Sequence, residues 1–242
     1  RASDGKQVFL DAREVAPAGA TRDMYLDAAG NPVEGLSTRS AKAAGIPGEP
    51  AGWDHLAQNY GRLSLAASLE PAIRFARKGH AISVARQAEL AEALDSEGLL
   101  GQAQSEFARI YLMAGKVPSA GHWMRQPDLA KSLEVLAKGG AEAFYRGPFA
   151  RKLVQGVQRL GGVWTEDDLA NYRVVEREPI VANYQGVRIV SAPPPSSGGV
   201  WLASVLNILS GYDLASLDAA TRKHLVLEAM RRAHRDRAQY LG

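Results

Sequence analysis

Residues Arg177–Leu209 read REPIVANYQGVRIVSAPPPSSGGVWLASVLNIL, and this stretch indicates the fold class. Its first part, Arg177–Ala192, favours two strands that meet at Tyr184-Gln185-Gly186, as a hairpin or a strand pair with a short turn. A stiff loop of prolines, serines and glycines follows, and the apolar run Val200–Leu209 predicts a helix. Strands and helices in this close succession predict an α/β (α+β) domain.

The loop Pro193–Gly199 invites two functional interpretations and one structural interpretation. A nucleoside-triphosphate loop needs a Lys and a Ser or Thr after its glycines, and a serine nucleophile elbow needs the pattern G-x-S-x-G; both are missing. The helix start at Gly199 can still offer backbone N–H groups to an anion. The structural alternative is a rigid strand-to-helix crossover in which Gly199 permits close packing, and the spacing favours it.

The rest of the chain is mainly helical in its periodicity. Residues Gln7–Ala16 predict a strand with a charged end, and Pro71 predicts a second helix start inside one helical segment. Thr165 opens a predicted capping box for a short helix. The predicted helical segments are Ser64–Lys78, Ser83–Leu94, Gln104–Leu112, a helix from Gln126-Pro127-Asp128 to Gly139-Gly140, Ala141–Leu160 with a break near Gly147-Pro148, and Thr221–Tyr240.

Composition excludes several classes of protein. The chain has 242 residues, 46% of them hydrophobic and 23% charged, which is typical of a globular protein with a substantial core. The net charge is +3 with the basic residues dispersed, so nucleic-acid binding is not indicated. No apolar run reaches the length of a membrane span, and no cysteine is present. The chain starts at Arg1 without Met, and we expect it to be part of a longer protein.

Few residues stand out as candidates for chemistry. The five histidines show no metal-binding spacing, the local carboxylate pairs fit helix capping or surface positions, and no cofactor is indicated. Arg13, in DAREVAP, follows an apolar strand and precedes a turn. Its planar guanidinium can bind a substrate carboxylate through two hydrogen bonds. The alternative, which the residues alone favour, is a surface ion pair of Arg13 with Glu14 or Asp11.

The order of ten short strings carries a more specific signal. From Val8 to Gly242 the chain resembles the large subunit of the γ-glutamyltransferase (γ-glutamyl transpeptidase) family. The strings are DAREVAP, ATRDMYLD, GIPGEPAGW, QNYGRLSL, EPAIRFARKG, QPDLAKSLEVLAKGG, AFYRG, GGVWTEDDLANY, PPPSSGG and DRAQYLG.

This resemblance implies a four-layer αββα fold of the N-terminal-nucleophile hydrolase type, completed by a small subunit cut from the same precursor. Residues 1–242 are then part of a single large-subunit domain. The N-terminal threonine of the small subunit is the nucleophile, so we expect no catalytic residue in this chain. Its four candidate threonines receive no such role: Thr21, Thr38, Thr165 and Thr221.

The resemblance also implies substrates and a site residue. A γ-glutamyl group passes from glutathione or a related donor to that threonine, and then to water or to an amino acid or peptide acceptor. Arg13 occupies the family position that binds the α-carboxylate of the donor. The alternatives are a glutaryl-cephalosporin acylase-like activity and an uncleaved, non-catalytic binding module. We expect a periplasmic or secreted location from the family.

Overall fold

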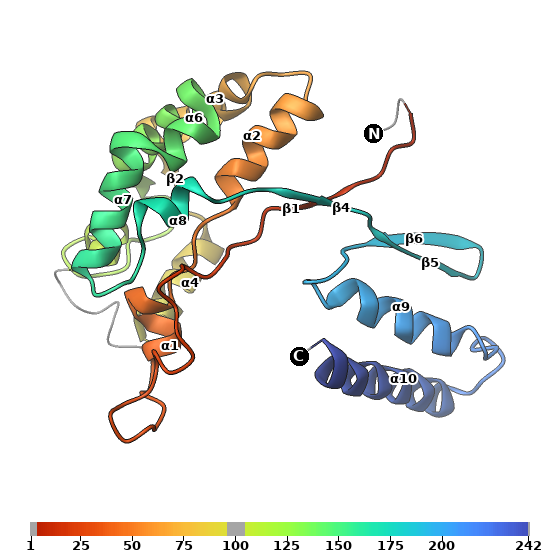
Figure 1. Ribbon diagram of the computed structural model, residues 1–242. Helices are drawn as coiled ribbons and strands as arrows, with labels where there is room; N and C mark the ends of the chain where they lie inside the picture. The colour runs from red at the N-terminus through yellow and green to blue at the C-terminus, as the bar shows by residue number, and fades with distance from the viewer. Residues whose placement is uncertain (1–3, 96–104, 242) are drawn as a thin grey trace. The chain divides into compact units, whose positions relative to one another are not determined.

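The computed structural model describes residues 4–95 and 105–241, and these divide into two compact units (Figure 1). The first unit contains the residues up to Asp11 together with those from Val174 onward. The second unit spans Ala12–Arg173 and contains most of the helices.

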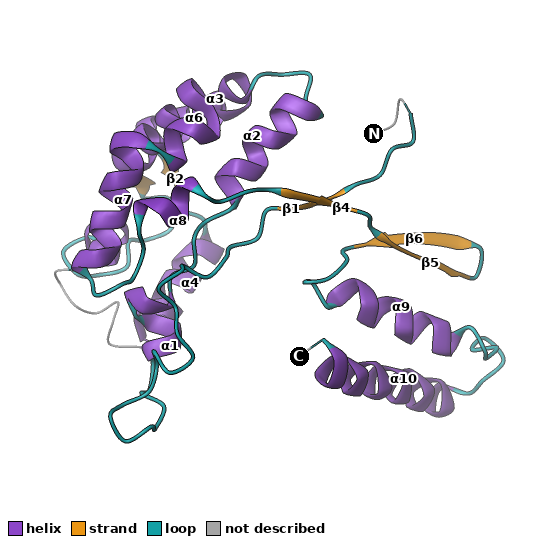
Figure 2. Cartoon of the chain, viewed as in Figure 1, coloured by secondary structure: helices purple, strands orange, loops and turns teal. Residues whose placement is uncertain are grey.

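The first unit confirms the predicted hairpin and the helix that follows it (Figure 2). Strands β5 (Ile180–Tyr184) and β6 (Val187–Ser191) pair antiparallel, and Gln185 and Gly186 form the turn with φ of 48° and 80°. Helix α9 (Gly198–Leu209) packs against β5, and α10 (Ala219–Tyr240) packs against α9. The core of this unit consists of Val205, Leu209, Ala229 and Ala233.

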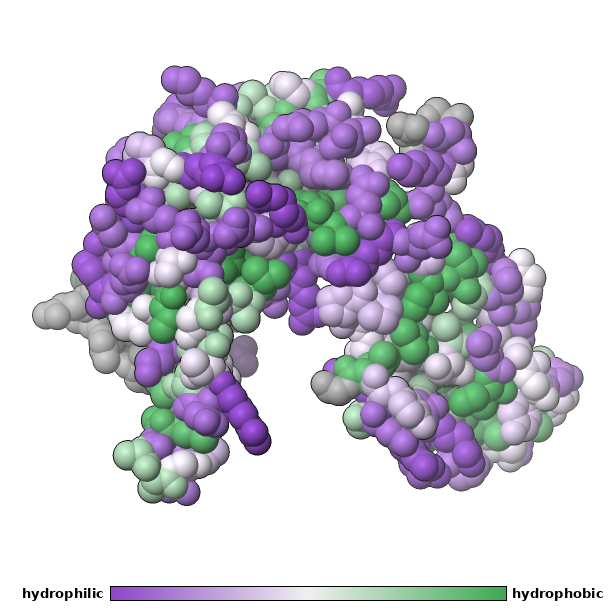
Figure 3. All heavy atoms as spheres, in the orientation of Figure 1, coloured by the Kyte–Doolittle hydropathy of each residue, from purple (hydrophilic) through white to green (hydrophobic). Residues whose placement is uncertain are grey.

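The alternation expected of a half-buried strand is visible in the hairpin. Ala182 is buried, whereas Val181 and its cross-strand partner Val190 are 46% and 39% exposed. On the face shown in Figure 3, hydrophobic residues gather over the hairpin and α9, while hydrophilic residues cover most of α6 and α7. On its outer face the hairpin therefore presents one exposed apolar pair, Val181 and Val190, beside the exposed polar pair Asn183 and Arg188.

The loop Pro193–Gly199 is a strand-to-helix crossover with close packing. A Cβ at Gly199 would lie 2.1 Å from the carbonyl oxygen of Ala192, so only glycine fits where the helix begins against the end of the strand. Helix α9 begins at Gly198, two residues before the predicted start at Val200.

The first strand is shorter than Gln7–Ala16. Strand β1 (Phe9–Asp11) pairs antiparallel with β4 (Val175–Arg177), and the pairing ends at Asp11. Asp11 accepts a hydrogen bond from Arg177 Nε at 2.8 Å. The residues that follow belong to the second unit, where Val15 forms an isolated bridge with Ile46.

The second unit is built from helices that match most of the predicted segments. Those with predicted counterparts are α3 (Leu65–Lys78), α4 (Val84–Asp95), α5 (Glu106–Tyr111), α6 (Pro127–Tyr145), α7 (Gly147–Arg159) and α8 (Glu166–Ala170). The unit also contains α1 (Leu36–Arg39), the 3-10 turn Ala41–Ala43, α2 (Glu49–Asn59), and the strand pair β2 (His80–Ala81) and β3 (Trp123–Met124). Gln104, the predicted start of one helix, lies outside the described residues.

Two interruptions in the helical pattern have different outcomes. The predicted second helix start at Pro71 is wrong, because α3 continues through it. Proline costs about 3 kcal/mol inside a helix, but α3 packs Leu65 and Leu69 against Leu136 of α6, and that packing keeps the helix continuous. The predicted break at Gly139-Gly140 is confirmed, since Gly140 has φ 61° and ψ −159° within α6.

Candidate functional site around Arg13

Arg13 lies in an extended segment of the second unit with an exposed side chain. Its Nε lies 3.4 Å from Glu14 Oε1, and the two side chains are 59% and 61% exposed. An ion pair this exposed contributes little stability. The neighbour pair that the sequence allowed is thus present, and more than half of the Arg13 side-chain surface is exposed.

The backbone around Arg13 is anchored, in contrast to its side chain. Tyr172 Oη donates a hydrogen bond of 2.7 Å to the Arg13 carbonyl oxygen. Two residues further on, Val15 and Ile46 exchange backbone hydrogen bonds of 3.2 and 2.8 Å. Ile46 is fully buried, so this second anchor is tied to the interior of the unit.

Buried aromatic side chains hold the neighbouring loop, Ala44–Gly48. Trp164 Nε1 donates to the Ala44 carbonyl at 2.9 Å, and Tyr145 Oη donates to the Pro47 carbonyl at 2.6 Å. The rings of Tyr145 and Tyr172 stack with centroids 5.5 Å apart and an interplanar angle of 12°. Burial raises the pKa of the Tyr145 phenol, so its hydroxyl remains a donor at physiological pH. Buried aromatic residues with polar ends thus tie the Arg13 segment and the adjacent loop to one stack.

Gly48 leaves the space in which Tyr172 reaches Arg13. A Cβ at position 48 would lie 2.0 Å from Tyr172 Oη and 2.3 Å from the Ala12 carbonyl oxygen. These distances are far below van der Waals contact, so the loop approaches the Arg13 segment closely because residue 48 is glycine.

Asp168 provides a third anchor a few residues beyond Arg13. It forms the predicted capping box with Thr165, and its Oδ1 also accepts a hydrogen bond of 2.7 Å from the Ala18 backbone N–H. Partial burial by itself would raise the pKa of the Asp168 carboxyl, but the hydrogen bonds from Ala18 and Thr165 outweigh it and lower the pKa below its ordinary value. One carboxylate therefore caps α8 and holds the Arg13 segment.

Asp54 is a buried carboxylate that stabilises the same unit from within. It is 8% exposed, and its Oδ2 accepts a hydrogen bond of 2.8 Å from the Ala141 backbone N–H, where α6 resumes after the kink. This contact caps the second half of α6, which carries Tyr145.

Sequence reasoning singled out Arg13 but not the residues that position it. Tyr145, Tyr172 and Trp164 occur in the strings AFYRG and GGVWTEDDLANY, and Gly48 in GIPGEPAGW. Those strings carried the family resemblance, yet nothing in their spacing shows that they converge. Among residues 4–95 and 105–241, no group of three or more His, Asp or Glu side chains is placed to hold a metal ion. No helix in that part of the chain has the length and apolarity needed to cross a membrane.

Comparison with known proteins identifies the family. The family model described as gamma-glutamyltranspeptidase matches residues 1–242, and the chain belongs to this family. It is 38% identical over 244 residues to the glutathione hydrolase proenzyme of Escherichia coli K12, covering 100% of this chain and 42% of that protein. The chain thus spans about two fifths of the length of the curated relatives it matches.

Solved structures show the same likeness. The γ-glutamyltranspeptidase of Helicobacter pylori matches with a TM-score of 0.93 and 37% identity, over 99% of this chain and 68% of that one. A cephalosporin acylase from Bacillus halodurans matches with a TM-score of 0.83 and 29% identity, over 96% of this chain and 43% of that one. The predicted α/β fold class, that of the N-terminal-nucleophile hydrolases, is confirmed.

Proposed function

We propose that the whole protein carrying this chain transfers or hydrolyses γ-glutamyl groups, with glutathione or a related γ-glutamyl compound as donor. Arg13 binds the α-carboxylate of that donor. The observation that carries the proposal is an exposed guanidinium on a backbone anchored by Tyr172, Ile46 and Asp168. Membership of the γ-glutamyltranspeptidase family and a relative named glutathione hydrolase proenzyme support the choice of donor.

The anchoring matters because binding costs entropy when the binding group must first be ordered. A guanidinium binds a carboxylate through two parallel N–H···O bonds, and a charge-assisted hydrogen bond contributes about 1.5–3 kcal/mol. Ordering one backbone residue costs about 1–2 kcal/mol, which is similar in size. A segment held in place before the donor arrives avoids most of that cost.

The chemistry itself requires a second subunit from the same precursor. The hydroxyl of its N-terminal threonine attacks the γ-carbonyl carbon of the donor, and the free α-amine accepts the hydroxyl proton. The carbon–nitrogen bond breaks, and the proton passes to the leaving amine. The γ-glutamyl ester is then cleaved by water, which gives glutamate, or by the amine of an amino acid or peptide, which gives a new γ-glutamyl amide. Throughout, Arg13 holds the end of the γ-glutamyl group remote from the reacting carbonyl.

Kinetics of Arg13 variants test the proposal on the assembled protein with γ-glutamyl-p-nitroanilide as donor. Arg13→Ala removes the whole contact and is expected to raise KM roughly tenfold or more. Arg13→Lys keeps the charge but loses the planar fork, so an intermediate KM is expected. An unchanged KM in Arg13→Ala would refute the assignment.

A second candidate donor is a glutaryl amide of the cephalosporin type, because a cephalosporin acylase is among the similar structures. Competition between a γ-glutamyl and a glutaryl donor in one assay separates the two activities. A third alternative is an uncleaved, non-catalytic protein. Mass spectrometry of the native protein decides this, since two polypeptides with a threonine at the start of the smaller one support an enzyme.

A further inference from the structure

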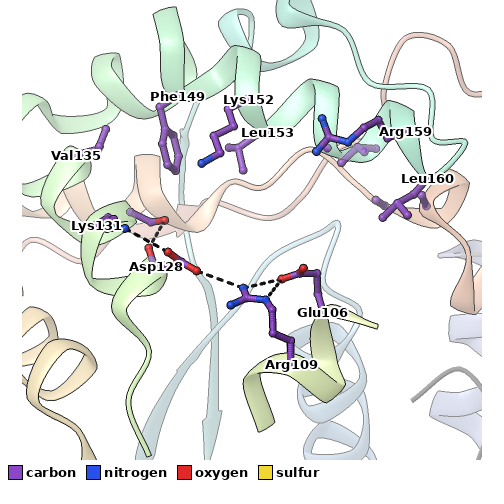
Figure 4. A pocket seen from close by; sticks show the side chains of 15 residues that line it. Glu106, Arg109, Asp128, Lys131, Val135, Phe149, Lys152, Leu153, Arg159 and Leu160 are labelled. Atoms are coloured by element: carbon purple, nitrogen blue, oxygen red, sulfur yellow. Dashed lines mark hydrogen bonds and ion pairs between the residues drawn. The ribbon is translucent and has the colours of Figure 1, made fainter. Parts of the chain in front are cut away.

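The second unit contains a cavity of about 760 Å³ between α7 and a charged cluster formed by α5 and the start of α6 (Figure 4). A volume of this size is typical of sites for small organic molecules. Arg13 is not among the residues that line the cavity.

One side of the cavity is a balanced network of charges. Arg109 donates to Glu106 Oε2 from Nη2 at 2.7 Å and from Nε at 2.9 Å, and to Asp128 Oδ2 at 3.2 Å. Lys131 Nζ lies 3.5 Å from Asp128 Oδ1. Hydrogen bonds from Arg109 lower the pKa of both carboxyls, so both remain ionised at neutral pH. Two cations therefore match two anions.

The opposite side adds two positive charges. Lys152 and Arg159 lie seven residues apart on α7, which places them on the same side of the helix two turns apart. In the described part of the chain, neither is within ion-pair distance of a carboxylate. With four cationic and two anionic side chains in the lining, the cavity has two positive charges in excess.

Apolar side chains form the wall between these charges. Phe149, Leu153 and Val157 come from α7, and Val135 comes from α6. Gly156 leaves a gap in the α7 wall, because a Cβ there would meet only Arg159 Nη2, at 3.8 Å. The cavity thus combines an apolar wall with two cationic side chains in excess.

We propose that this cavity is a binding site for a small organic anion, in which a phosphate or carboxylate contacts Lys152 and Arg159 and an aromatic or branched aliphatic group packs against Phe149, Leu153 and Val157. Charge complementarity selects the anionic group, since a neutral molecule leaves the two excess cations without a partner. The apolar wall selects the body of the ligand, since inorganic phosphate covers none of that surface.

Calorimetric titration of the whole protein tests this proposal with 1-naphthyl phosphate and 1-naphthoate as probes. Both are expected to bind, whereas 1-naphthol and inorganic phosphate bind at least tenfold more weakly. The ratio of the two anion affinities shows whether phosphate or carboxylate is preferred. Binding of the probes should persist in Arg13→Ala. Failure of the cavity proposal is therefore distinguishable from failure of the proposed donor site at Arg13.

Variants locate the binding to the cavity. Lys152→Gln and Arg159→Gln are each expected to weaken binding of 1-naphthyl phosphate roughly tenfold. Lys138→Gln removes the same charge from an exposed position of α6 outside the lining, and it should have no effect. Gly156→Leu fills the gap with a strong helix former and should abolish binding without loss of folding. Equal affinity for 1-naphthol, no binding of either anion, or equal effects of the three Gln variants would overturn the proposal.

Discussion

Tyr172→Phe removes only the hydroxyl that reaches the Arg13 carbonyl. The ring stays on Tyr145, and the bond lost is the one of 2.7 Å. A neutral hydrogen bond contributes about 0.5–1.5 kcal/mol, and a partly buried acceptor left without its donor adds to the loss. We therefore expect the variant to be about 1–2 kcal/mol less stable. Without this bond, part of the Arg13 backbone must be ordered when the donor binds, which costs about 1 kcal/mol. This cost corresponds to a rise in KM of about fivefold.

Steady-state kinetics with γ-glutamyl-p-nitroanilide measure this effect on the assembled protein, alongside a melting curve. KM should rise about fivefold while kcat changes less than about twofold, because in the proposed role Arg13 contacts the donor equally in the ground and transition states. Tyr145→Phe is the matched control. It removes the hydroxyl of Tyr145, the ring stacked on Tyr172, and that hydroxyl donates to the Pro47 carbonyl oxygen rather than to that of Arg13. A similar stability loss with a smaller change in KM is expected. Equal KM values for Tyr172→Phe and the unaltered protein would refute the positioning role.

Substitutions at three further positions test the frame around Arg13. Gly48→Ala places a Cβ 2.0 Å from Tyr172 Oη. We expect denaturant unfolding to show a loss of more than about 2 kcal/mol in the free energy of unfolding, together with a raised KM. A variant as stable as the original would contradict the packing. Asp54→Ala removes the cap at Ala141 and should cost about 1–2 kcal/mol, whereas Asp54→Asn, which keeps an acceptor, should cost less. The pKa of Asp168 is lower when folded, so its stabilisation is present above the unfolded pKa of about 4 and is lost as pH falls through the folded value. Melting curves of Asp168→Asn and the unaltered protein should therefore converge at low pH, and a gap that persists there would argue against the ionised carboxylate.

Local patterns predicted the elements of this fold well where local physics determines them. The hairpin at Gln185-Gly186, the kink at Gly140 and the capping box at Thr165 each depend on the conformational freedom or side-chain chemistry of a few neighbouring residues. The prediction of a second helix start at Pro71 was wrong because a distant contact, rather than local sequence, determines the structure there. The local penalty of Pro71 is outweighed by the packing of α3 on α6, which the α3 sequence alone does not reveal.

In the candidate site, too, local sequence pointed to one residue, whereas the residues that position it could not be predicted from local sequence. Arg13 was a candidate because its residue type and neighbours matched a family string. The residues that anchor its segment are distant in sequence: Tyr172 lies 159 residues from Arg13, and Asp168 lies 150 residues from its partner Ala18. Contacts over such separations can be seen only in the folded chain. Gly48 likewise owes its role to Tyr172 and the Ala12 carbonyl, which approach it in space.

The central claim is that Arg13 binds the donor through its α-carboxylate, and a pair of donors tests this directly. 4-Aminobutyryl-p-nitroanilide has the same chain and amine as γ-glutamyl-p-nitroanilide but lacks the α-carboxylate. Measured with the assembled protein, Arg13→Ala should raise KM roughly tenfold or more for the γ-glutamyl donor and leave KM for the 4-aminobutyryl donor within about twofold. An equal rise for both donors, or no rise for either, would contradict the claim.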